Sequence, residues 1–353
     1  MAQPSRAVTP AVVLEDALAL ASLERWRAAA SGARQPERPW KQWDHVVVLA
    51  GELQVLVNLC QQRDLRPCAS RGKAVGALTL LVRERSWDGV VRWDLPVRSR
   101  PGVFGARVGT AQVQVQAGAL RLQVEDRALG ARIELRLAAE GLPLTSPAVP
   151  LGGGTFQWLA LPCLRATGTV EWRGRRHRLR DAPAYHDENW GWWRWGEDFA
   201  WQWAYVPSNS GWVAVLSRML DRRRAVEHDV RLLLWRDGAL ARSFQGREVS
   251  VTARGWFPER PAPARFPAIA NLLAEGNVTD VPATLEITAR RSNERVQLEL
   301  TAAEVAQLAV PNETDLEVTW VNEVAVQARL DGSIAGERLG GGGPALLELV
   351  HGS

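Results

Sequence analysis

Hydrophobic and polar residues alternate with a period of two along most of the chain beyond about residue 40. The segments Val113–Gln116, Leu120–Val124 and Ile133–Leu137 alternate strictly. Because successive side chains of a strand point to opposite faces, each segment predicts a strand with one buried and one solvated face. Gly118 and Gly130 lie in the short connections between these segments. The pattern predicts an up-and-down antiparallel meander.

Similar segments extend this β pattern to both ends of the chain. They are His45–Ala50, Leu53–Leu59, Ala77–Val82, Thr167–Trp172, Arg176–Leu179, Val230–Trp235, Val249–Thr252, Leu285–Thr288, Val296–Leu300, Leu316–Val326 and Leu346–Val350. Asp-Gly pairs at 88–89, 237–238 and 331–332 predict tight turns. The run Gly340–Gly343 predicts a flexible linker.

Two segments depart from this pattern and predict helices. Ala11–Ala30 is rich in Ala, Leu, Glu and Arg, and Thr9-Pro10 before it suits a helix start. Ser31-Gly32 ends this helix. A second, short helix is expected near Ala268–Ala274.

The hairpins fall into two successive sets, each of the size of a lipocalin. Closing such meanders into barrels removes exposed strand edges. We therefore expect an all-β fold of two lipocalin-like antiparallel β-barrels in tandem, with a short N-terminal helix. The expected boundaries are residues 1–36 for the N-terminal segment, 37–196 for the first barrel and 197–353 for the second.

Composition excludes several classes of protein. The chain has 353 residues, 46% hydrophobic and 23% charged, as in an average globular protein. No apolar stretch approaches 18 residues, so we expect no transmembrane segment, and contact with a membrane surface stays open. The net charge of +4 comes mainly from scattered arginines, so we expect no nucleic-acid partner.

The cysteines and the N-terminus point to the cytoplasm. The chain has three cysteines, Cys60, Cys68 and Cys163, which form neither a disulfide framework nor a zinc-binding spacing. A reducing compartment fits this usage best. The N-terminus does not resemble a signal peptide.

Tryptophan is the unusual residue, with 17 copies against 6 phenylalanines and 2 tyrosines. The densest stretch begins Tyr185-His-Asp-Glu-Asn-Trp-Gly191 and continues through Trp212. In an extended segment His186 and Glu188 point one way and Asp187 the other. Further along, Phe199, Trp201, Trp203 and Tyr205 share one face.

Ionisable groups among indole rings make an unusual core. Burial raises the pKa of a carboxyl group, so Asp187 and Glu188 are expected to have raised pKa values unless His186 or Arg194 offsets the effect. A neutral carboxylic acid in an apolar pocket is a proton donor that can act on a weak base.

This segment resembles the signature of the carotenoid 1,2-hydratase (hydroxyneurosporene synthase) and AttH-like family. That signature reads approximately Tyr-His-Asp-His-Asn-Trp-Gly, and Glu188 stands where the hydratases have a second histidine. The resemblance implies tandem lipocalin-like barrels and no metal or redox cofactor. It also implies an activity on acyclic carotenoids, or on the polyenes that related cyclases and Diels–Alderases fold.

The resemblance and the residues together give a candidate site. Tyr185, His186, Asp187 and Glu188 are the expected catalytic residues. Indole faces stabilise carbocations by roughly 2 kcal/mol each when desolvated. The expected substrate-binding residues are Trp190, Trp192, Trp195, Trp201, Trp203 and Tyr205. We expect no metal, since no metal-ligand spacing occurs, and His45, His177, His228 and His351 receive no function.

Three functions remain open. The first is hydration of a terminal C=C bond in an elongated hydrophobic polyene or terpenoid, by proton transfer. The second is cyclisation of a linear polyene precursor, as by a Diels–Alderase or other pericyclase. The third is a non-catalytic carrier of hydrophobic ligands. The sequence does not choose among them, nor does it identify the substrate, the stereochemistry, the oligomeric state or the proton donor.

Overall fold

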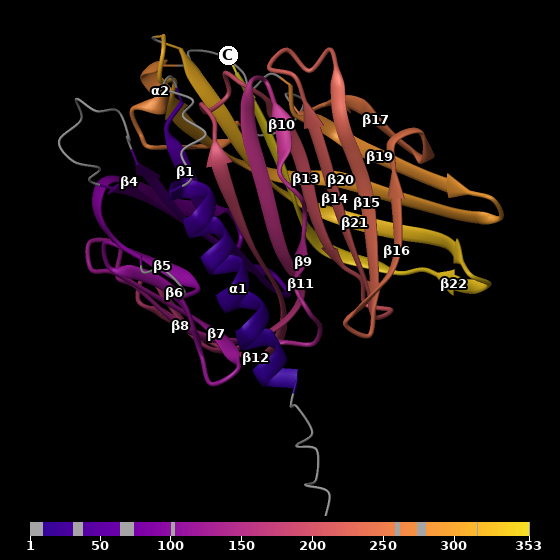
Figure 1. Ribbon diagram of the computed structural model, residues 1–353, viewed down its shortest axis with the longest axis horizontal. Coiled ribbons are helices and arrows are strands. Elements are labelled where there is room, and N and C mark those ends of the chain that lie inside the picture. Colours follow the sequence, from indigo (N-terminus) through magenta and orange to yellow (C-terminus); the bar gives the residue numbers. More distant parts are fainter. Residues whose placement is uncertain are drawn as a thin grey trace, which may run out of the picture.

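The protein is described here by a computed structural model that covers residues 10–30, 38–63, 74–99, 103–257, 262–273, 280–315 and 317–352. Two large sheets lie side by side, and helix α1 (Pro10–Ala30) crosses the first of them (Figure 1). This helix and the short α2 (Ala270–Leu273) confirm both predicted helices. Cys68 and the signals predicted to bound the first helix, Thr9 and Ser31-Gly32, lie outside the described residues.

The first sheet has twelve strands. They are β1 (Trp40–Ala50), β2 (Leu53–Arg63), β3 (Ala74–Arg83), β4 (Trp87–Arg98), β5 (Gly105–Val108), β6 (Ala111–Gln116), β7 (Ala119–Asp126), β8 (Ala131–Ala139), β9 (Leu144–Thr145), β10 (Val149–Leu151), β11 (Gly154–Trp172) and β12 (Arg175–Trp192).

Ten of these strands close into an antiparallel barrel. Each of β1 to β8 pairs with its neighbour in sequence, β12 joins β1 to β11, and β11 returns to β8. The pairing of β8 with β11 runs from Ala139–Leu164 to Arg132–Glu171 and leaves no open edge there. The predicted meander and the first predicted barrel are confirmed.

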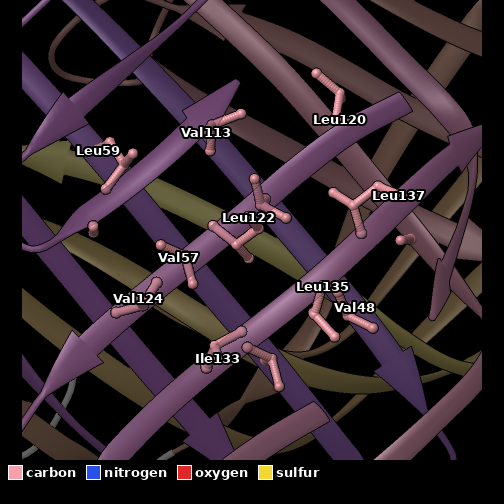
Figure 2. Close-up of a cluster of buried hydrophobic side chains, with 14 of the residues drawn as sticks. Val48, Val57, Leu59, Val113, Leu120, Leu122, Val124, Ile133, Leu135 and Leu137 are labelled. Atoms are coloured by element: carbon pink, nitrogen blue, oxygen red, sulfur yellow. The ribbon is translucent and has the colours of Figure 1, made fainter. Parts of the chain in front are cut away.

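Apolar side chains at alternate strand positions fill the barrel interior. The inward residues of β1, β2 and β6 to β8 form one apolar core, seen as labelled sticks in Figure 2. Leu14, Leu18 and Ala21 of α1 belong to the same core, so the helix packs against the barrel interior. Ser22 and Arg25 follow on α1 and are also buried.

The second sheet has eleven strands. They are β13 (Ala200–Pro207), β14 (Trp212–Leu220), β15 (Glu227–Arg236), β16 (Ala239–Gln245), β17 (Val249–Trp256), β18 (Ala264–Phe266), β19 (Pro282–Arg291), β20 (Glu294–Pro311), β21 (Val318–Ile334), β22 (Glu337–Leu339) and β23 (Gly342–Gly352).

This second sheet curls around an apolar core of its own but is not closed by a strand ladder among the described residues. Its edge strands are β16 and β17, which a single 3-10 turn (Gly246–Glu248) connects. Arg291 of β19 connects the two edges of the sheet, since it donates hydrogen bonds to the carbonyl oxygen of Ser243 on β16 and to Glu248 in the 3-10 turn. A second closed barrel therefore stays a prediction. The domain boundaries predicted at residues 36 and 196 also stay predictions.

A third apolar core lies between the two sheets. The outer face of the barrel contributes Val47, Leu56 and Tyr185, and the second sheet contributes Trp203 and Val321. The candidate site is at this interface.

Three predicted connections are wrong. Asp88-Gly89 lies inside β4 rather than in a turn, and Asp331-Gly332 lies inside β21. A Cβ atom at Gly89 would collide with the carbonyl oxygen of Leu80, so glycine permits close strand contact there. A Cβ atom at Gly332 would likewise meet the carbonyl oxygen of Arg295. The predicted linker Gly340–Gly343 runs into strand β23.

Within the described residues, neither helix combines the length and apolarity needed to cross a bilayer. Cys60 and Cys163 are free thiols.

Candidate active site between the two sheets

Strand β12 carries the signature segment, and its side chains alternate as predicted. His186 contacts Phe104 of the barrel core, and Trp190 and Trp192 belong to that core. Tyr185 and Asp187 point the other way, toward the second sheet. One strand thus divides the predicted residues between the barrel interior and the interface.

A cavity of about 40 Å³ lies at the interface beside Asp187. This space holds about three water molecules, at roughly 10–15 Å³ each. The cavity is lined mainly by aromatic side chains with a few polar groups among them. The lining includes Trp43, His45, Phe156, Trp158, Asp187, Asn189, Trp193, Phe199, Trp201, Trp203, Met219 and Glu348.

Three side chains hold the carboxyl group of Asp187. The Tyr185 hydroxyl (2.8 Å) and Trp158 Nε1 (3.0 Å) donate to Oδ2, and Asn189 Nδ2 donates to Oδ1 (2.9 Å). These donors favour the carboxylate form. Burial favours the neutral acid and dominates, with help from the nearby Glu348 carboxyl, and it raises the pKa of Asp187 to about 8. The raised pKa expected from the sequence is confirmed, and the group is mostly protonated at neutral pH.

The second sheet brings two more carboxyl groups to the interface. Glu348 of β23 and Glu323 of β21 are direct cross-strand partners, and both are buried. Glu348 Oε1 accepts a hydrogen bond from Trp201 Nε1. Burial raises the pKa of Glu348 to about 7. Burial and the neighbouring Glu348 carboxyl raise the pKa of Glu323 well above its ordinary value.

His45 of β1 faces the same cavity. It lies opposite Asp187 in the pairing of β1 with β12, and its Nδ1 is 4.0 Å from Glu348 Oε2. Its ring centroid is 5.1 Å from that of Trp203. Burial lowers the pKa of His45 to about 3, so the imidazole is neutral and can accept a proton only transiently. The cavity therefore combines neutral acids with one neutral base.

The opposite face of β12 has a different polar cluster, inside the barrel. Glu188 forms an ion pair with Arg25 of α1 and accepts a hydrogen bond from Gln42. Asp44 of β1 lies beside them, and burial raises its pKa to about 6 while the Arg25 charge lowers it. The charge that offsets Glu188 is thus Arg25, whereas the sequence suggested His186 or Arg194.

His186 is held within this barrel cluster. Its Nδ1 lies 3.1 Å from the carbonyl oxygen of His45, and its Nε2 is 4.0 Å from Asp44 Oδ1. Burial lowers its pKa to about 4. Arg194 instead pairs with Asp198, which also binds Arg38.

The structure thus brings only some of the predicted residues together. Asp187, Trp201 and Trp203 line the cavity, and Tyr185 binds Asp187. Trp195 packs against the ring of Trp201 (5.8 Å between centroids). The others lie apart: Tyr205 donates to the carbonyl oxygen of Ala184, and His186, Glu188, Trp190 and Trp192 face the barrel.

Sequence reasoning missed several residues of the interface. Trp43, His45 and Trp158 come from β1 and β11, whose register against β12 is set by long-range pairing. Glu323 and Glu348 carried a readable signal, because each is an acid within an otherwise apolar strand segment. The described residues contain no group of three or more side chains suited to hold a metal ion.

Comparison with solved structures places this fold. An AttH candidate from Nitrosomonas europaea aligns with a TM-score of 0.57 at 12% identity, over 90% of this chain and 93% of that one. Kievitone hydratase from Nectria haematococca gives 0.57 at 11% identity, over 88% of each chain. CghA, a pericyclase, gives 0.58 at 14% identity, over 90% and 88%.

The chain has the fold of the AttH-like, lipocalin-type proteins. This result confirms the likeness to AttH-like proteins that the signature segment indicated, and two closed barrels in tandem stay a prediction. No protein-family model and no curated protein sequence matches the chain. At 11–14% identity the structural likeness concerns the fold alone.

Proposed function

We propose that the protein is a cofactor-free enzyme of the hydratase or cyclase class that acts on an elongated hydrophobic alkene. The carboxyl group of Asp187, buried among indole rings without a cation beside it in the described part of the chain, is the observation that carries this proposal, and this burial raises its pKa. A hydratase and a pericyclase with the same fold support the class. An acyclic carotenoid is the first substrate to test.

Asp187 supplies the proton in this mechanism. Its O–H bond breaks as a new C–H bond forms at one end of the C=C bond, which leaves a carbocation on the other carbon. The rings of Trp158, Trp201 and Trp203 line the cavity around that charge and stabilise it. Tyr185, Trp158 and Asn189 then stabilise the carboxylate through the hydrogen bonds they already donate.

The fate of the cation separates the two classes. In a hydration, water attacks the cation and passes a proton to His45, whose Nε2 has no hydrogen-bond partner. In a cyclisation, a second C=C bond of the substrate attacks, and the product cation returns a proton to the Asp187 carboxylate or passes it to His45. The small volume of the cavity bears on both reactions, because the space beside the reacting end must hold either a water molecule or a second C=C bond.

The size of the cavity also limits how the substrate binds. About 40 Å³ admits only a reacting end, so the rest of the molecule extends past the half-buried Phe156 and Trp201 at the rim. These side chains must move apart to admit it.

The test is incubation of the purified protein with lycopene or neurosporene in detergent, analysed by mass spectrometry. A product heavier by one water supports hydration, and an unchanged mass with altered retention of a linear polyene supports cyclisation. We expect Asp187→Asn to abolish either product and Glu188→Gln, on the barrel face, to retain it in the folded fraction. Quenched tryptophan fluorescence without any product would overturn the enzyme proposal and leave a carrier.

A further inference from the structure

The carboxyl groups at the interface lack a compensating cation. Asp187, Glu323 and Glu348 come from three strands of two sheets and are at most 3% exposed. Among the described residues, the basic group that approaches any of them is His45, 4.0 Å from Glu348. The nearby Lys41 is turned to Glu313 and lies over the ring of Trp195. A buried acidic group without a partner is costly, so such a cluster is unusual unless it has a ligand.

The carboxyl groups of this cluster are hydrogen-bond acceptors when ionised, and the neutral ring of His45 offers one further acceptor. Within the described residues, His45 Nε2 has no hydrogen-bond partner, and apart from the Trp201 donor the carboxyl groups of Glu348 and Glu323 have only each other. Glu348 and His45 line the cavity itself. A primary ammonium group carries N–H donors and a positive charge, which complement hydrogen-bond acceptors of negative charge.

The remaining walls of the cavity also suit a cation. Indole rings attract positive charge through their negative faces, and most strongly where water is excluded. Trp43, Trp158, Trp201 and Trp203 line the space together with the acids. The combination of tryptophan rings and carboxyl groups favours a ligand that carries a cationic group.

We propose that this cavity binds the primary ammonium group of an otherwise apolar amine. Its volume of about 40 Å³ fits an ammonium or methylammonium group. The apolar part of the ligand lies against Phe156, Trp193, Phe199 and Met219, which form an apolar cluster at the same cavity. The inference adds a substrate class to the site of the proposed function and rests on that site.

Binding of such a ligand is coupled to proton release. The titratable groups that line the cavity are Asp187 from β12, His45 from β1 and Glu348 from β23. Tyr185 hydrogen-bonds to Asp187, and Glu323 of β21 is the cross-strand partner of Glu348. Because burial raises the pKa of Glu348 to about 7 and that of Asp187 to about 8, these acids hold protons below neutral pH. The ammonium group replaces the proton of Glu348 and leaves that of Asp187 in place, so its affinity rises as the pH rises through about 7. A neutral ligand shows no such dependence.

The experiment compares hexylamine with 1-hexanol, which has the same chain length and no charge. Binding to the full-length protein is measured by tryptophan fluorescence at pH 8 and pH 6. We expect hexylamine to bind at least about tenfold more tightly than 1-hexanol at pH 8, with a much smaller preference at pH 6. Hexylamine stays protonated at both values.

Two substitutions and a control locate the effect. Glu348→Gln removes an acid at the cavity and is expected to abolish the preference for the amine while leaving 1-hexanol binding unchanged. Glu323→Gln serves the same purpose if the first variant does not fold. Glu299→Gln removes the same charge from the exposed face of β20 and keeps the preference.

Equal binding of amine and alcohol, or no binding of either, would overturn the inference. A preference that survives in both Glu348→Gln and Glu323→Gln would overturn it as well. None of these measurements requires turnover. A protein that prefers the amine but converts no alkene would therefore contradict only the proposed enzyme function. A protein that converts alkenes without this preference would contradict only the amine-binding inference.

Discussion

On the barrel face of β12, Glu188 pairs with the guanidinium group of Arg25, whereas on the interface face Asp187 meets two further carboxyl groups and a neutral histidine. The two clusters share a strand, and their acids are equally buried. The barrel cluster receives its cation from helix α1. The interface cluster has no such helix, and its acids hold protons instead.

The difference assigns different roles to residues that are adjacent in sequence. A buried acid that is paired and hydrogen-bonded is stable as an anion and has little tendency to give up or take a proton. A buried acid without a cation stays protonated near neutral pH and can donate that proton. We therefore regard Glu188 as structural and Asp187 as the reactive group.

The largest expected effect is on the barrel cluster. Arg25→Met keeps an unbranched apolar stem and removes the charged guanidinium group, which leaves Glu188 and Asp44 buried without the cation of Arg25. Breaking a buried ion pair in this way costs about 3–5 kcal/mol of unfolding free energy. Urea unfolding at pH 8 measures the change.

Arg127→Met is the matched control, because Arg127 is 92% exposed. Its variant should unfold as the wild type does. An Arg25→Met protein that keeps the wild-type stability at pH 8 would show that α1 does not compensate the barrel acids, and the contrast between the two faces would disappear.

At the interface, removal of a charged group is expected to raise the unfolding free energy instead of lowering it. The folded-state pKa of Glu348, about 7, lies above its ordinary value of 4.5. Its contribution to stability is therefore complete below about pH 4.5 and is lost as the pH rises through 7. Glu348→Gln removes this loss, so the variant should be more stable than the wild type by about 2–3 kcal/mol at pH 8 and similar to it at pH 4.

Urea unfolding of both proteins across pH 4 to 9 measures this dependence, with Glu299→Gln as the exposed control. If Glu348→Gln destabilises the protein equally at every pH, the carboxyl group is ionised and paired in the folded state. The interface cluster would then resemble the barrel cluster.

Much of the fold could be predicted from the sequence because a period of two is a local signal. The strands of the meander and the N-terminal helix follow from it. The turns at Asp88-Gly89 and Asp331-Gly332 could not, since a glycine that allows close strand contact looks the same as a turn glycine. Only the pairing of distant strands distinguishes the two.

The sequence allowed prediction only of those site residues that lie on the single strand β12. Alternation alone separates Asp187 from His186 and Glu188, and burial among indoles predicts the raised pKa of Asp187. Arg25 and Glu348 lie more than 100 residues away in sequence from Asp187. Their positions depend on how α1 enters the barrel and how the second sheet packs, which no local pattern records.

The smallest expected effect concerns a single hydrogen bond within the interface cluster. Trp158 Nε1 donates to Asp187 Oδ2, and this bond is the main factor that opposes burial in setting the pKa of Asp187. Trp158→Phe keeps an aromatic ring and removes the donor. Because the lost bond stabilised the carboxylate, the pKa of Asp187 should rise by about one unit. Carboxyl-carbon NMR titration measures the value.

Trp190→Phe provides the comparison on the barrel face of the same strand. Trp190 Nε1 donates to Gln157 Oε1 (2.8 Å), so this variant loses a similar bond, worth about 1 kcal/mol, without touching Asp187. Its Asp187 should titrate as in the wild type. A pKa that rises in both variants would mean that general loosening of the core, and not the Trp158 donor, controls the acid. A rise in Trp158→Phe alone ties the proton affinity of Asp187 to the interface face, and the pH optimum of turnover should then move upward with it.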